Sequence, residues 1–178
     1  MKATRSILAA MVLGTALGAT QVSAQCSGAG SCNTTNTASV TVGALVKLDM
    51  SSTTTALTAP TADQVASGAT IADAGPSFTI KTNRSYTMKI KSGSALNWTY
   101  VGSDAGVKPI SDLTWSNAAA GAYAAISAVD ATFTSGASAT NGTAAQVFFK
   151  TVWASDFTSM SNAPGTYSLP IVFTLSAP

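Results

Sequence analysis

The chain has 178 residues, only 9% of them charged, and it contains no histidine. Without histidine, neither a Ser-His-Asp triad nor a Cys-His pair can be built, which excludes the commonest nucleophilic enzymes. The 9 Lys and Arg residues stand against 7 acidic residues, so no strong basic excess points to nucleic acid as a partner.

Residues 1–24 have the pattern of a cleavable secretory signal peptide. Lys2 and Arg5 precede an apolar stretch over residues 7–17, and small residues lead to a predicted cleavage after Ala24. An apolar stretch of about 11 residues is too short for a membrane span, which takes about 20. The pattern predicts export, and no later stretch predicts a transmembrane anchor. Cleavage would remove two of the cations and leave a mature chain of near-zero net charge.

Residues 25–37 form a predicted flexible lead-in that holds both cysteines, Cys26 and Cys32. Outside the cytoplasm, this even pair favours one local disulfide. A lipid anchor on Cys26 is an alternative, but Gln25 is not the small residue that lipid attachment requires. A metal site would need further Cys or His ligands. No cofactor or metal is therefore expected here.

Residues 38–178 are predicted to form one β-rich domain. Apolar and polar residues alternate over Ala38–Met50, with a bend at Gly43, and residues 51–74 read as a long connection with one short strand at most. The clearest alternation covers residues 77–91. It predicts a β-hairpin with its turn at residues 82–84.

Further strands are predicted in the second half of the chain, around residues 96–100, 110–115, 147–153 and 167–175. Residues 121–133 would also permit a helix, but flanking glycines and local alternation favour a strand. Pro170 cannot donate a ladder hydrogen bond, so it predicts a sheet edge or a bulge in the last strand.

Together these segments predict an all-β fold. About seven to nine short strands, Gly- and Ser-rich turns and no convincing amphipathic helix are typical of an antiparallel immunoglobulin-like β-sandwich. A closed barrel stays open as the alternative.

No residue pattern indicates catalysis, so we expect a protein that is not an enzyme. The acidic residues are all Asp and lie mostly in predicted turns, where their side chains bond the backbone. Calcium takes oxygen ligands, yet only Asp104 and Asp112 come near each other in the sequence. Aromatic side chains in the strands could form either a sugar-binding platform or the core. The candidates are Trp98, Tyr100, Trp115 and Trp153.

Three features of the chain occur together. The export signal is followed by the alternating segment Ala38–Met50, a strand begins at Asn83–Met88, and the turn Pro164–Ser168 leads into a last strand near the chain end. In this combination the chain resembles the secreted pilin-like sandwiches of bacteria, the group of spore coat protein U domains and fimbrial subunits. It departs from the group at Leu169, where an acidic residue often follows the turn, and in cysteines that do not span the domain.

The resemblance implies assembly by strand addition, in which the incomplete sheet of one subunit accepts an extended segment from its neighbour. Residues 25–36 lack the apolar residues of such a donor, so either Ala38–Met50 is the donor or the subunit folds complete, which we favour. We expect a secreted structural or adhesive protein of the periplasm or bacterial cell surface, such as a fimbrial or matrix subunit that associates with itself or with an envelope protein. The alternative is a carbohydrate-binding module.

Overall fold

The computed structural model describes residues 29–33 and 36–178. The predicted signal peptide, residues 1–24, lies outside the described residues. The β-rich unit comprises Val42–Pro178. Its elements in chain order are β1 (Val46–Met50), α1 (Ala62–Ser67), β2 (Thr70–Thr82), β3 (Tyr86–Ser92), β4 (Thr99–Gly102), η1 (Ile110–Asp112), β5 (Leu113–Ser116), β6 (Ala124–Ala125), β7 (Ala131–Gly136), β8 (Thr140–Val152), η2 (Met160–Asn162), β9 (Gly165–Ser168) and β10 (Ile171–Ser176).

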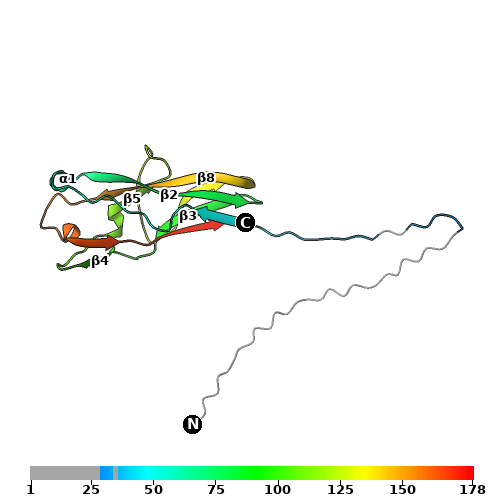
Figure 1. Ribbon diagram of the computed structural model, residues 1–178, viewed down its shortest axis with the longest axis horizontal. Helices are drawn as coiled ribbons and strands as arrows, with labels where there is room; N and C mark the ends of the chain where they lie inside the picture. Colours follow the sequence, from blue (N-terminus) through cyan, green and yellow to red (C-terminus); the bar gives the residue numbers. More distant parts are fainter. Residues whose placement is uncertain (1–28, 34–35) are drawn as a thin grey trace, which may run out of the picture. The chain divides into compact units, whose positions relative to one another are not determined.

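The strands form two main antiparallel sheets that pack across one core (Figure 1). The larger sheet has the order β1-β2-β8-β5-β6 and the smaller has the order β10-β3-β7, while β4 pairs with β9. Phe78 of β2 contacts Phe133 of β7 and Phe173 of β10, with ring centroids 5.8 and 4.6 Å apart. The prediction of an antiparallel all-β fold is confirmed. The described residues hold ten strands, slightly more than expected.

Strand β2 lies between β1 and β8 in the larger sheet and buries alternate side chains. Phe78 and Ile80 are 2% and 0% exposed. The pairing with β8 shifts in register between Ala74 and Ser77, where Gly75 and Pro76 lie. A bulge at this point keeps Pro76 out of the hydrogen-bond ladder, to which it could not donate.

The predicted hairpin over residues 77–91 is wrong. Strands β2 and β3 follow each other in the chain but belong to different sheets. Both edges of β2 are occupied, one by β1 and the other by β8, so no edge is left for β3. The alternation itself is correct, since it reports one buried face and does not say whether two consecutive strands pair or face each other across a core.

The long connection before β2 contains a helix that the sequence pattern did not predict. Thr61 caps α1, accepting a hydrogen bond from the Gln64 backbone N–H, and the Gln64 side chain bonds back to Thr61. Gly68 ends the helix in the left-handed conformation, with a φ of 62°. This capping box with a terminal glycine is a recognisable signal in the sequence. Only six residues form the helix, too few to give a clear amphipathic pattern.

Three further predictions concern individual strands. Only Val46–Met50 of the predicted segment 38–50 is a strand, and the residues before it pair with no described strand. Residues 121–133 contain no helix and include the start of β7, as favoured. The sequence pattern predicts Pro170 inside one last strand over residues 167–175, but this residue lies between β9 and β10, which belong to different sheets. Because proline cannot donate a ladder hydrogen bond, it stands where the strand is interrupted.

Candidate functional site

The core-facing side of β1 is left partly uncovered. Leu48 and Met50 stand opposite Ile80 and Phe78 of β2 in the register, so these side chains share one face of the sheet. Ile80 and Phe78 are buried, whereas Met50 is 41% exposed and Val46, in the same row, is 48% exposed. The larger sheet has five strands and the smaller has three, with β10 at its edge. The smaller sheet therefore covers the outermost strand of the larger one only in part.

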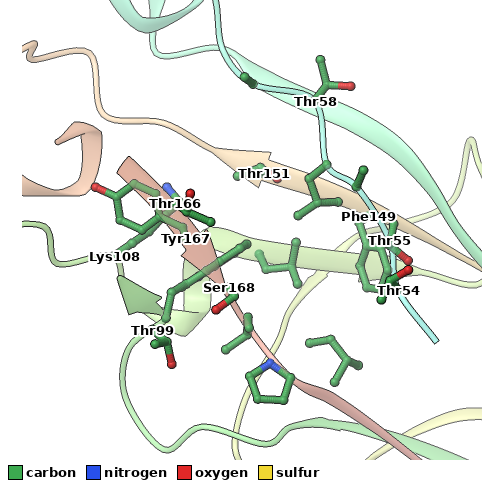
Figure 2. A pocket seen from close by; sticks show the side chains of 18 of the residues that line it. Thr54, Thr55, Thr58, Thr99, Lys108, Phe149, Thr151, Thr166, Tyr167 and Ser168 are labelled. Atoms are coloured by element: carbon green, nitrogen blue, oxygen red, sulfur yellow. The ribbon is translucent and has the colours of Figure 1, made fainter. Parts of the chain in front are cut away.

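A groove of about 950 Å³ opens beside this row. One wall is the connection between β1 and α1, residues 52–60, and the other is the chain over residues 162–171, which includes β9. The floor contains core-facing side chains of β5 and β8, namely Leu113, Phe149 and Thr151. Figure 2 shows Thr151 between Thr58 of the first wall and the β9 residues Thr166 and Tyr167. The groove therefore reaches into the core between the two sheets.

The first wall is held in place by hydrogen bonds to β2. The Thr58 backbone N–H and hydroxyl donate to the two carboxylate oxygens of Asp73 at 3.1 and 2.6 Å. Closer to β1, the Ser77 backbone N–H donates to the Ser51 hydroxyl at 3.0 Å. Leu57, between these anchors, packs against the core. The wall is thus a strand-free segment fixed at several points.

The second wall has a backbone edge without a strand partner. Among the described strands, β10 pairs only with β3, and β9 pairs only with β4. An unpaired strand edge presents N–H and C=O groups that can bond a further strand. Ile171 and Phe173, at this edge, line the groove with their apolar side chains. An apolar groove along an open strand edge is the arrangement that accepts an extended peptide.

The end of the groove near β9 is polar and aromatic. Lys108 is 0% exposed, and its ammonium donates to the Val152 carbonyl at 2.6 Å and to Asp112 at 3.1 Å. The same nitrogen lies 4.1 Å from the centroid of the Trp153 ring. Burial lowers the pKa of Lys108 below its usual 10.5, while the charge and hydrogen bond of Asp112 act in the opposite direction. Tyr167 packs edge-on against Trp153, and burial raises the pKa of its hydroxyl.

Two buried polar atoms at this end have no hydrogen-bond partner among the described residues. They are the Thr151 hydroxyl oxygen and the Trp153 indole nitrogen. Both residues line the groove, and Thr151 is 2% exposed. Buried polar groups are nearly always paired, so each exception calls for a physical reason.

The four candidate aromatic residues lie in two different environments. Trp98 and Trp115 are 8% and 9% exposed and belong to the core, so neither offers an open ring face. Tyr100 and Trp153 are half-buried and both contact Tyr167, at centroid distances of 4.9 and 6.3 Å. Only the second pair lies at the surface where a ligand could meet it, and sugar binding by these residues stays a prediction.

The remaining predicted groups do not gather at the groove. Cys26 lies outside the described residues, so the Cys26–Cys32 disulfide stays a prediction, and Cys32 is not a free cysteine. Asp112 is engaged with Lys108, and Asp104 is exposed. Over residues 29–33 and 36–178, no three His, Cys, Asp or Glu side chains group as metal ligands would, and no helix has the length and apolarity of a membrane span.

Sequence reasoning missed the groove and two of its polar residues. Thr151 follows Val147 and Phe149 in the alternation of β8, so the sequence predicts that its side chain points inward. A polar residue in a row of buried apolar residues indicates a special role at that position. Lys108 lies outside any strand, and nothing in its neighbours indicates burial. The two walls, residues 52–60 and 162–171, are far apart in the sequence and line one groove only in the folded chain.

Comparison with known proteins found no match for this chain: no family model matches it, and no curated protein matches it.

Proposed function

We propose that this chain is an exported structural subunit of the bacterial envelope or surface, an immunoglobulin-like sandwich that associates with copies of itself by strand addition. The observation that carries the proposal is the apolar groove along the unpaired edge of β9 and β10, beside the uncovered row of β1. An open sheet edge over an accessible core supports an incomplete sandwich more than the complete fold favoured from the sequence. The chemistry needed is binding by surfaces, without a catalytic group.

The donor would be the segment before β1. Strand β1 pairs with β2 of its own chain, so it is not free to leave. Residues 36–42 precede it, lie outside any strand and alternate apolar with polar side chains. Val40 and Val42 are 87% and 65% exposed, a high exposure for β-branched apolar residues. Placed in the groove of a second copy, they would cover apolar surface in both chains.

The experiment compares two matched double variants of the mature chain from residue 25 onward. V40D/V42D places two charges on the apolar side of the segment, and S39D/T41D places the same two charges on the opposite side. Light scattering after size exclusion and negative-stain microscopy measure assembly. We expect oligomers or fibres from the parent chain and from S39D/T41D, and monomers from V40D/V42D. A parent chain that stays monomeric at high concentration, or two variants that behave alike, contradicts the proposal.

Carbohydrate binding is the second candidate. Its support is that hydroxyl side chains line the groove walls and that Trp153 and Tyr167 stand at one end. Sugars are held by such combinations of hydrogen-bonding groups and ring faces. Retention of a monomeric protein on immobilised polysaccharide, abolished by W153A, would favour this function over assembly.

A further inference from the structure

We propose that the Thr151 hydroxyl and the Trp153 indole N–H form a polar subsite that receives the side-chain amide of Asn36 from a second copy and so fixes the register of the inserted segment. This inference rests on the proposed function, because it names the partner atoms within the same groove.

The first support is that these two atoms lack hydrogen-bond partners, whereas the polar groups next to them at this end of the groove have them. The neighbouring Lys108 ammonium has two hydrogen-bond acceptors, and the Tyr167 hydroxyl lies 3.0 Å from the Ala163 carbonyl oxygen. Only the Thr151 and Trp153 atoms are buried there without a partner in the described chain. A buried polar group left unpaired costs roughly 1–3 kcal/mol, so a guest that pairs both atoms gains binding free energy from them.

The second support is the chemistry that these atoms require. An indole N–H can only donate, so the guest must present an acceptor to Trp153. A threonine hydroxyl can accept or donate, so it can meet a donor at the same time. The side-chain amide of asparagine offers both groups on one carbon. Asn36 is exposed and lies at the start of the free segment.

The third support is a match of spacing between segment and floor. In the floor of the groove, β8 presents Phe149 and then Thr151, an apolar position followed by a polar position on the same face. On the segment, side chains of one face are Val42, Val40, Ala38 and Asn36, also apolar positions followed by a polar one. The step from the apolar to the polar position is two residues in both, about 7 Å in an extended chain. Asn36 therefore reaches Thr151 when Ala38 lies at Phe149 and Val42 lies farther from the polar end.

This register also determines the direction of the inserted segment. Strand β10 runs from Ile171, opposite Ser92, to Ser176, opposite Thr87. The polar end of the groove is lined by residues 166–168 of β9, before β10 in the chain. A segment that enters with Asn36 at this end and continues toward Val42 runs in the same direction as β10. The inserted strand would thus be parallel to β10, in a sheet whose own strands are antiparallel.

The test uses the mature chain carrying V40D/V42D as host, because it cannot insert its own segment, and a synthetic peptide of residues 36–45 as probe. Titration calorimetry gives the Kd of host and peptide. We expect T151V to raise the Kd roughly fivefold to tenfold, as the loss of one net hydrogen bond does, and a peptide with N36A to raise it further, because N36A also removes the contact with Trp153. Combining T151V with N36A should raise the Kd little beyond N36A alone, since N36A already removes the contact with Thr151. T132V, at an exposed position of β7 that does not line the groove, is the matched control and should leave the Kd unchanged.

Stability of the free host gives a second measurement. Because the Thr151 hydroxyl is unpaired in the free chain, T151V should not lower the Tm of the unliganded host. A peptide whose Kd is insensitive to T151V, or single effects that multiply in the combined variant, overturns this inference while leaving strand addition intact. A parent peptide that does not bind the host at all overturns both the inference and the proposed function.

Discussion

The exposure of the β1 row can be tested by replacing Met50 or Met88 with alanine and comparing how much each change lowers the free energy of unfolding. Met50 is 41% exposed and lines the groove, whereas Met88, in the centre of β3, is 0% exposed. Met88→Ala removes a fully enclosed side chain and leaves a cavity, so it should lower the free energy of unfolding by about 2–5 kcal/mol. Met50→Ala removes a side chain that is little more than half buried, at an open site. Scaling the roughly 1.5–3 kcal/mol of a whole Met side chain by that fraction gives about 1–2 kcal/mol.

Urea unfolding measures both values, with tryptophan fluorescence as the signal, since Trp98 and Trp115 are buried in the core. Dilute protein keeps the chain unassembled, so that no second copy covers Met50. If M50A costs as much as M88A under these conditions, the row is closed in the free chain and the reasoning about an incomplete sheet fails. On the proposed function, M50A should also weaken association, because the inserted segment would contact Met50.

Two further predictions concern the core and its buried lysine. A Cβ on Gly75 would lie 2.5 Å from a ring carbon of Phe149, so Gly75→Ala should lower the free energy of unfolding by about 1–3 kcal/mol. Gly43 has open space around it, so Gly43→Ala should change the free energy of unfolding little in the same urea experiment. Because burial lowers the pKa of Lys108, the unfolded chain binds its proton more tightly, and the free energy of unfolding should rise with pH between the lowered pKa and 10.5. Urea titrations from pH 7 to 10 should show that rise in the parent chain but not in K108M.

How far the sequence predicts the fold depends on what alternation can report. It identified the buried faces of β2, β3 and β8 correctly, because one apolar face per strand is a local property. It could not assign β2 and β3 to different sheets, since pairing depends on which edges other strands already occupy. Strand β8, far away in the sequence, takes the edge of β2 that a hairpin would have used. Long-range pairing therefore decided the topology.

The candidate site was less predictable because it arises from unequal numbers of strands in the two sheets. The aromatic candidates Trp98 and Trp115 follow the alternation into the core, as large apolar side chains in strands usually do. Lys108 is buried through its ion pair with Asp112 and its bond to the Val152 carbonyl, partners that the sequence does not bring together visibly. Only Thr151 could have been identified, as the polar member of an inward row.

The exposed valines before β1 and the partly uncovered row of β1 fit together on the proposed function. Val40 and Val42 are costly to leave in water, and a chain that folds complete has no use for them in that position. Met50 is likewise exposed on a core-facing row. The two exposed sets are complementary, since one is an extended apolar face and the other a groove bounded by an unpaired strand edge. On the proposed function, each would remove the unfavourable exposure of the other when they belong to different copies, and this burial would be the driving force for assembly.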